Sequence, residues 1–278
     1  MLFRIKKIDL LIKHSTMNLN LTNKNALVCG STQGIGKAVA LELAEMGANL
    51  TLVARNEDRL KAVLADLDTS KGQQHDYFCA DFSTPEVLES NLNTYLANGK
   101  TIHVLVNNTG GPAGGPIEKA GIHEFRAAFE MHLICNHILA TAVKDGMQKA
   151  GYGRIINVIS TSVKQPLNGL GVSNTIRGAV ASWAKTMANE LGGYGITVNN
   201  VLPGATNTLR LQSIIENKAK KQGKSIDVVA DAMKSAVPAG RFAEASEIAN
   251  AIAFLASPAA AYINGINVPV DGGRTKSL

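Results

Sequence analysis

Three glycines, Gly30, Gly34 and Gly36, stand where backbone amides could hold a phosphate group. They follow the apolar run Asn25–Cys29 and open a segment with helical periodicity, which is the setting in which glycine-rich turns bind dinucleotides. Gly30 would allow a tight turn, while Gly34 and Gly36 would let the helix start approach a pyrophosphate, whose charge the helix dipole favours. The residues between these glycines that would line the same site are Ser31, Gln33 and Ile35.

Seven apolar runs could supply the strands that position this turn. They are rich in Val, Ile and Leu without alternation, as expected of strands buried on both faces of a sheet. Helical patterns at 33–46, 122–150 and 172–191 lie between them. Strand–helix alternation with right-handed crossovers predicts an α/β fold: a single doubly wound, seven-stranded parallel sheet of the Rossmann type, with helices on both faces. The expected strands are Asn25–Cys29, Asn49–Ala54, Asp76–Cys79, Ile102–Val106, Arg154–Ile159, Ile196–Val201 and Ile266–Val270.

Composition narrows the class of protein. Hydrophobic residues make up 45% of the 278 residues and charged residues 18%, which fits one large folded domain and excludes a disordered chain. The net charge of +6 comes from scattered basic residues, so we expect no nucleic-acid partner. The distant cysteines Cys29, Cys79 and Cys135 have neither metal-ligand spacing nor the even number of a disulfide framework. We therefore expect no metal site and a reducing, cytoplasmic location.

The first seventeen residues precede the strand–helix pattern. Their apolar stretch Ile8–Ile12 is too short to span a bilayer, contains Asp9 and is followed by no small-residue cleavage site. We expect no membrane segment or secretory signal here. Residues 1–17 are interpreted as an extension that is disordered or, if translation begins at Met17, absent; a short basic arm that touches a partner is the alternative. Residues 18–278 are expected to form a single domain.

Further motifs follow the glycine-rich turn in a recognisable order. They are Asn107-Asn-Thr-Gly110, Ser160 at the end of Ile155-Ile-Asn-Val-Ile-Ser160, Pro203-Gly204 and Val270-Asp-Gly-Gly273. Together with Gly30-x-x-x-Gly34-x-Gly36 they resemble the short-chain dehydrogenase/reductase family, most closely its 3-oxoacyl-[acyl-carrier-protein] reductase-like members. The resemblance spans most of the chain and implies hydride transfer between a nicotinamide cofactor and a carbonyl or alcohol.

The resemblance also assigns cofactor contacts. At the end of the second strand, NAD-preferring relatives carry a carboxylate for the ribose hydroxyls, whereas this chain has Ala54 followed by Arg55. A guanidinium is a forked cation suited to a 2′-phosphate, so NADP(H) is favoured over NAD(H). The alternative is that Arg55 is only a solvated charge at a strand end. Further contacts implied by the family motifs are Asp81, Phe82, Asn107, Gly110, Pro203, Gly204 and Thr206, with Arg177 at the nicotinamide ribose.

The catalytic Tyr and Lys of the family are both missing. In the family they lie four residues apart on one helix, where the Tyr donates a proton to the developing alkoxide and the Lys lowers the pKa of that Tyr. Thirteen residues after Ser160 stands Ser173, and four residues further stands Arg177; none of the five tyrosines has a Lys four residues later. A serine is shorter and far less acidic than a phenol, and arginine stays protonated, so neither replaces the lost group.

His132 is the best remaining candidate for proton transfer. It takes the position of a family Asn that holds a water, and imidazole titrates near pH 6.5. It could equally be a helix histidine packed against the neighbouring strand. Lys164 could reach the site from the loop after Ser160, or could be solvated. The expected catalytic residues are Ser160, His132, Ser173 and Arg177.

Residues from about 206 to 240 are expected to form a substrate lid. Their apolar residues and the basic run Lys218–Lys221 would suit an acyl-phosphopantetheine or small-molecule substrate, or equally an ordinary amphipathic helix. The favoured function is an NADP(H)-dependent 3-oxoacyl-[acyl-carrier-protein] reductase-like oxidoreductase with an altered proton relay. The alternative is a catalytically impaired NADP(H)-binding pseudoenzyme that acts as a sensor or oligomer subunit. The resemblance implies a homotetramer or dimer, paired through the helices at 122–150 and 172–191.

Overall fold

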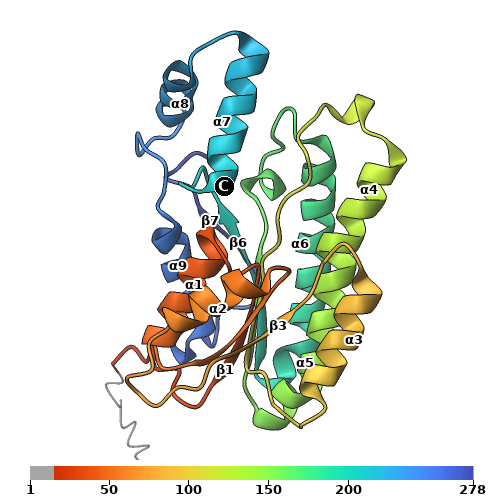
Figure 1. Cartoon of the computed structure of the whole chain (residues 1–278), viewed down its shortest axis with the longest axis vertical. Helices are drawn as coiled ribbons and strands as arrows, with labels where there is room; N and C mark the ends of the chain where they lie inside the picture. Colours follow the sequence, from red (N-terminus) through yellow and green to blue (C-terminus); the bar gives the residue numbers. More distant parts are fainter. Residues whose placement is uncertain (1–15, 278) are drawn as a thin grey trace, which may run out of the picture.

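The computed structural model describes residues 16–277 and contains one sheet of seven parallel strands. The strands are β1 (Asn25–Cys29), β2 (Asn49–Ala54), β3 (Asp76–Cys79), β4 (Val104–Asn107), β5 (Gly153–Val158), β6 (Ile196–Pro203) and β7 (Asn267–Val270). Their order across the sheet is β3-β2-β1-β4-β5-β6-β7 (Figure 1). The direction of winding therefore reverses between β1 and β4, which is where doubly wound sheets bind ligands at the carboxyl ends of their strands.

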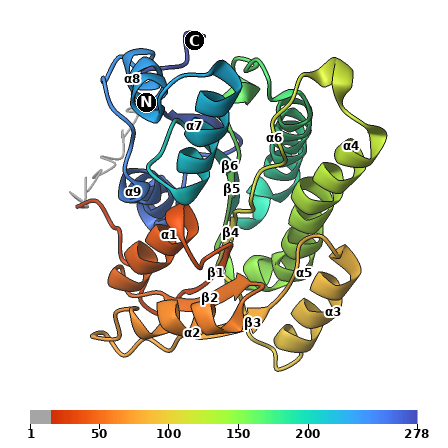
Figure 2. The ribbon, with the colours of Figure 1, turned by 45° about the horizontal axis from the view of Figure 1, so that its top comes forward.

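Helices cover both faces of this sheet (Figure 1 and Figure 2). One face carries α1 (Gly34–Glu45), α2 (Glu57–Ala65) and α9 (Ala245–Ala256). The other carries α3 (Pro85–Leu96), α5 (Cys135–Ala150) and α6 (Gly171–Leu191), with α4 (Ile122–Phe129) packed against α6. Beyond the carboxyl ends of the strands, at the top of Figure 1, rise α7 (Leu209–Gln222) and α8 (Ile226–Ser235).

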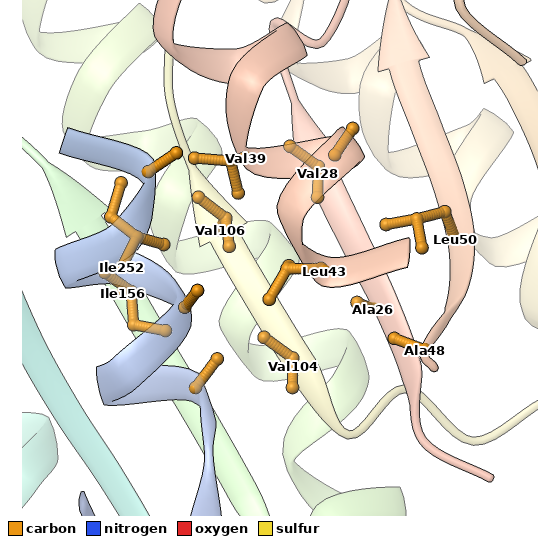
Figure 3. Close-up of a cluster of buried hydrophobic side chains, with 14 of the residues drawn as sticks. Ala26, Val28, Val39, Leu43, Ala48, Leu50, Val104, Val106, Ile156 and Ile252 are labelled. Atoms are coloured by element: carbon orange, nitrogen blue, oxygen red, sulfur yellow. The ribbon is translucent and has the colours of Figure 1, made fainter. Parts of the chain in front are cut away.

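The apolar strand runs form the inner layer of both helix–sheet interfaces. On one face Val28 packs with Leu43 of α1 and Ile252 of α9, and all three are fully buried (Figure 3). The preceding residue, Leu27, belongs to the opposite cluster together with Leu139 of α5. Successive residues of one strand thus serve opposite faces, which explains why these strands are apolar without alternation.

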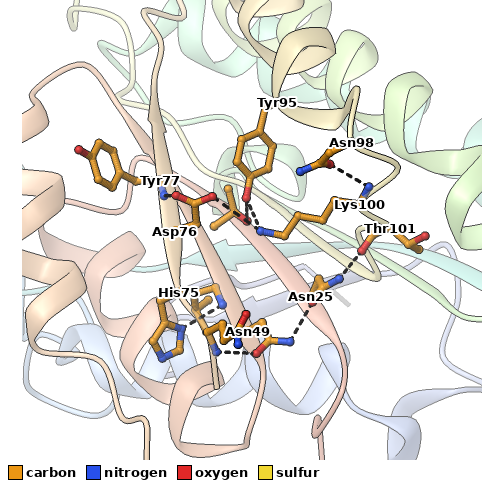
Figure 4. Close-up of polar contacts among 12 residues, drawn as sticks. Asn25, Asn49, His75, Asp76, Tyr77, Tyr95, Asn98, Lys100 and Thr101 are labelled. Carbon is orange, nitrogen blue, oxygen red and sulfur yellow. Dashed lines mark hydrogen bonds and ion pairs between the residues drawn. The ribbon is translucent and has the colours of Figure 1, made fainter. Parts of the chain in front are cut away.

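The amino ends of β1, β2 and β3 are held by polar contacts (Figure 4). Asn49 Nδ2 donates to Asn25 Oδ1 at 3.0 Å, which links the first residues of β1 and β2. Lys100 Nζ donates to the Tyr95 hydroxyl and lies 3.9 Å from the Asp76 carboxylate. These contacts satisfy polar groups that the strands leave at their starts, so this end of the sheet is structural.

The predicted fold is confirmed, with local differences. All seven predicted strands are present, and their bounds move by at most two residues. The helix predicted over 122–150 is interrupted by the π-helical segment Glu130–Ile134 (η2), which divides it into α4 and α5. Of the predicted extension at 1–17, residues 1–15 lie outside the described part of the chain. Among residues 16–277, no helix is both long and apolar enough to cross a membrane.

Candidate active site

The turn between β1 and α1 places the three glycines at the carboxyl edge of the sheet. Gly30 has a φ of +60°, in the left-handed region that favours glycine. A Cβ on Gly36 would lie 2.1 Å from the Gly30 carbonyl oxygen and 2.7 Å from Asn108 Nδ2, so only glycine fits this crossing. Asn108 Nδ2 donates to the Cys29 carbonyl at 3.2 Å, which ties the turn to the segment after β4.

The start of α1 has the chemistry of a phosphate site. The Gln33 side chain does not cap the helix and the first turn holds no acidic residue, so the free N–H groups and the helix dipole are uncompensated. In the same turn the Ser31 hydroxyl is fully buried and has no hydrogen-bond partner among the described residues. Ile35 is half-buried at the helix start. These features fit a cofactor pyrophosphate.

Four asparagines form one hydrogen-bonded row across β4, β5, β6 and β7. Asn107 Nδ2 donates to Asn157 Oδ1, Asn157 Nδ2 to Asn200 Oδ1, and Asn200 Nδ2 to Asn267 Oδ1, each at 2.8 Å. The row fixes the direction of every amide. Asn107 Oδ1, at the end of the row, is consequently buried without a partner in the described chain and remains an acceptor for a ligand hydroxyl or amide.

Arg55 and Asp81 lie at neighbouring strand ends, after β2 and β3. Arg55 Nη1 is 3.8 Å from Asp81 Oδ2, and the Arg55 side chain is 75% exposed. The backbone N–H of Ser83 and, more weakly, the charge of Arg55 lower the pKa of the Asp81 carboxyl. Phe82 is buried beside it. Arg55 is thus loosely held at the position predicted for a 2′-phosphate contact.

Ser160 follows the end of β5, and Arg177 contacts the last residue of the same strand. Ser160 Oγ accepts a hydrogen bond from the Ser162 N–H at 3.1 Å, so its own O–H stays available as a donor. Arg177, buried on α6, donates from Nη1 to the Val158 carbonyl at 3.2 Å, two residues before Ser160. Burial and the nearby charge of Arg210 lower the pKa of Arg177 to about 10, so the guanidinium remains cationic at neutral pH.

His132 lies in the π-helical segment η2 and is buried in the wall of the site. Its Nδ1 is 2.6 Å from Thr109 Oγ1, and its Nε2 is buried without a partner among residues 16–277. Burial first, and the charge of Arg177 second, lower the pKa of His132 to about 3. The imidazole is therefore neutral at physiological pH. Its role as proton donor stays a prediction that requires a neutral N–H to act as the acid.

Ser173 lies one turn before Arg177 on the same side of α6, as the sequence spacing requires. It is half-buried, and its side chain is too short to replace a phenol. No tyrosine occurs anywhere on α6, so nothing on this helix takes over the missing proton donor.

The segment predicted to form a lid contains α7 and α8. It follows Pro203 and Gly204, where a Cβ on Gly204 would lie 2.7 Å from the Cα of Asp271, so the chain after β7 packs against this loop. Thr206 is buried, and its hydroxyl donates to the Gly204 carbonyl at 3.1 Å, which leaves the hydroxyl oxygen as an acceptor. The two helices enclose a small apolar cluster of Leu211, Ile215, Ala219, Val229 and Phe242.

Known proteins share this arrangement over nearly the whole chain. The family model described as enoyl-(acyl carrier protein) reductase matches residues 30–275. The 3-oxoacyl-[acyl-carrier-protein] reductase FabG of Vibrio cholerae is 35% identical over 92% of this chain and 98% of its own length. The chain belongs to the short-chain dehydrogenase/reductase family.

Other members of the short-chain dehydrogenase/reductase family extend the comparison. The NADPH-dependent reductase BacG of Bacillus subtilis is 29% identical over 93% of this chain and 100% of its own. The solved structure of L-sorbose reductase from Gluconobacter frateurii, complexed with NADPH and L-sorbose, has a TM-score of 0.88 and 30% identity, covering 94% of this chain and 100% of that one. Family membership makes this chain an oxidoreductase with an NAD(P)-binding fold.

Three residues of this short-chain dehydrogenase/reductase site were not found from the sequence. Thr208 caps α7, and its methyl group lies 3.2 Å from the position of a Cβ on Gly34; a threonine before a helical run was a readable cap signal. Asn108 was missed because only Asn107 and Gly110 of the same motif were assigned a role. Arg210 had no sequence signal, because its hydrogen bond of 2.8 Å to the Pro112 carbonyl depends on how the lid folds back.

Proposed function

We propose that this protein is an NADP(H)-dependent oxidoreductase that interconverts a carbonyl and an alcohol on a 3-oxoacyl-type substrate, with a proton relay that differs from that of its family. The observation that carries the proposal is the placement of Ser160 and Arg177 at the end of β5. Ser160 has an O–H to donate, and Arg177 has a permanent charge and further N–H donors. Both groups can stabilise a developing alkoxide.

Ser160 and Arg177 have different roles in the proposed carbonyl reduction. A bound nicotinamide supplies the hydride. Ser160 donates a hydrogen bond to the carbonyl oxygen, and Arg177 stabilises the negative charge that develops there. The proton that completes the alcohol comes from water or from His132, so a carbonyl, NADPH and one proton give an alcohol and NADP⁺. Because no positioned phenol assists, we expect a rate about 10²–10⁴-fold below that of an intact relay.

The preference for NADP(H) rests on Arg55. Ala54 provides no carboxylate for the ribose hydroxyls, and the exposed Arg55 guanidinium can turn toward a 2′-phosphate and leave its weak contact of 3.8 Å with Asp81. Relatives named as NADPH-dependent or solved with NADPH, such as BacG and L-sorbose reductase, are consistent with this preference.

The substrate class is inferred from the lid. A cavity of about 390 Å³ beside α7 and the start of α8 is lined mainly by apolar side chains, together with the polar Asn207, Thr208 and Gln212; the apolar residues are Leu209, Leu211, Ile215, Ile226 and Phe242. This lining suits an acyl chain, and the exposed lysines of the basic run 218–221 on α7 suit an anionic carrier.

A homotetramer or dimer would form through α5 and α6, where Gly178 leaves open space for a partner helix. Light scattering at micromolar concentration tests assembly, and a monomer would count against it.

The decisive experiment restores the family pair with Ser173→Tyr and Arg177→Lys in one chain. The unmodified protein and the double variant are first titrated with NADPH, then assayed with acyl-thioester ketones, small ketones and quinones. We expect weak ketone reduction by the unmodified protein and a gain of about 10²-fold or more in kcat for the double variant. Each single variant serves as a control, because neither completes the pair.

Failure of this experiment has a clear meaning. If NADPH binds to both proteins but neither reduces any ketone, the substrate pocket no longer serves carbonyl chemistry. The NADP(H)-binding pseudoenzyme, acting as a sensor or oligomer subunit, would then be the better description.

A further inference from the structure

Two arginines from different parts of the chain converge on one point beside Gly111. A Cβ on Gly111 would lie 3.9 Å from Arg210 Nη2 and 4.0 Å from Arg177 Nη2. Arg177 reaches this point from α6 and Arg210 from the first turn of α7. We call Arg177 and Arg210 the arginine pair.

The arginine pair has no acidic partner in the described part of the chain. Among the ion pairs of residues 16–277, none includes Arg177 or Arg210. The first turn of α7 carries no acidic residue, and a cation there faces the positive end of the helix dipole. Buried charges in proteins are normally paired, and Arg177 is 6% exposed. The site therefore has the electrostatics of an anion-binding site without an anion of its own.

We propose that the arginine pair binds an anionic group of the substrate, a carboxylate or a phosphate. This inference rests on the proposed function, because it places the anion next to the reacting carbonyl rather than at a separate site. Two guanidinium groups offer forked N–H donors that match the oxygens of either anion. The substrate would then be a 3-oxo acid or a phosphate-bearing acyl carrier rather than a neutral ketone.

The geometry favours the substrate over the cofactor as the source of the anion. At the start of α7, Thr208 faces the glycine-rich turn, since its methyl lies 3.2 Å from the position of a Cβ on Gly34. Arg210 instead reaches the segment after β4, where its Nη2 donates to the Pro112 carbonyl. The arginine pair thus lies beside Gly111 rather than beside Gly34 of the glycine-rich turn.

The test compares an anionic and a neutral form of one ketone. Acetoacetate and methyl acetoacetate are assayed with saturating NADPH, using the unmodified protein, Arg210→Gln and the control Lys149→Gln. Lys149 is exposed in the last turn of α5, just before the start of β5, so its replacement removes one positive charge far from the carboxyl ends of the strands. We expect Arg210→Gln to lower kcat/KM for acetoacetate by about tenfold to a hundredfold, with little change for the ester. Equal losses for both ketones would overturn the proposal.

A binding measurement tests the arginine pair independently of whether the protein reduces a ketone. Acetoacetate and inorganic phosphate are titrated into each protein saturated with NADPH, and the thermal midpoint is recorded. A rise for the unmodified protein and Lys149→Gln, but not for Arg210→Gln, supports the arginine pair even if no ketone is reduced. If Arg210→Gln instead weakens NADPH binding and neither anion raises the midpoint of any protein, the cofactor occupies the pair and the proposal fails.

Discussion

Replacing Arg177 with methionine should stabilise the cofactor-free protein, although Arg177 lies at the centre of the candidate site. The guanidinium is buried and makes one hydrogen bond, from Nη1 to the Val158 carbonyl at 3.2 Å. It has no carboxylate partner within the described residues and faces the charge of Arg210. A methionine keeps most of the side-chain volume and removes the unpaired charge. The variant therefore avoids the free-energy penalty of burying that charge in the cofactor-free protein.

The size of this effect follows from the pKa of Arg177. Lowering it from the ordinary arginine value to about 10 corresponds to about 3 kcal/mol, at about 1.36 kcal/mol for each pKa unit. Loss of the hydrogen bond to Val158 and imperfect packing of the methionine lower the free energy of unfolding by about 1–2 kcal/mol. The net gain is about 1–2 kcal/mol, or roughly 2–8 °C in Tm. Because the folded-state pKa is the lower one, the cost is fully present below pH 10 and fades only above it, so pH 6 and pH 8 should give equal gains.

Urea unfolding of the cofactor-free protein measures this gain, and Arg154→Met provides the matched control. Arg154 is also a buried arginine, but it donates to the carbonyls of Gly153, Ser257 and Gly195 and stacks on the Tyr152 ring at 4.2 Å. Its removal should therefore destabilise the protein. If both variants lose similar stability, Arg177 is a structural cation like Arg154 and the reasoning about an unbalanced site is refuted.

Three further predictions concern the cofactor turn and the histidine. Arg55→Ala should erase a tighter binding of NADPH than of NADH, measured by fluorescence titration; equal affinities in the unmodified protein would refute the assignment. Gly36→Ala should raise the Kd for NADPH at least about tenfold, since a Cβ would meet the Gly30 carbonyl at 2.1 Å, whereas Gly178→Ala on α6, where a Cβ meets no atom of this chain within 4 Å, should leave that Kd unchanged. Because the folded-state pKa of His132 is lowered to about 3, the unfolded chain binds the proton more readily and stability falls as pH drops from about 6.5 toward 3. His132→Asn should flatten that fall in urea unfolding at pH 4 and pH 7, and an unchanged slope would show that other groups cause it.

Much of the fold could be predicted because local patterns determine it. After its first residue the run Asn25–Cys29 is apolar, and it lies between polar residues and a glycine-rich turn; the structure makes it the interior strand β1 with the same bounds. The helix α6 likewise begins and ends within one residue of its predicted range. In both places the local sequence pattern and the burial of apolar side chains in the folded protein favour the same element, so the local prediction holds.

The site was less predictable because its geometry depends on segments far apart in the sequence. Ser160, Ser173 and Arg177 could be assigned by counting along the chain, and they lie where that count implies. Arg210 could not be found, since its contact with Pro112 joins residues almost a hundred positions apart. The π-helical turn that holds His132 was not predicted either, because the apolar pattern over residues 122–150 was interpreted as one continuous helix.

The charges of the site explain what the lost Tyr and Lys leave behind. A lysine at position 177 would sit as a point charge beside a tyrosine and lower its pKa; with Ser173 in place of that tyrosine, there is no acid left to tune. An arginine serves a site that must hold charge, because its planar donors stay protonated even when burial lowers the pKa to about 10. Burial also keeps the neighbouring His132 neutral, because it lowers the pKa of the imidazole to about 3. In the mechanism that we propose, a fixed positive potential takes the place of a proton relay, which would favour anionic substrates and any step whose rate depends on stabilising an oxyanion rather than on supplying a proton.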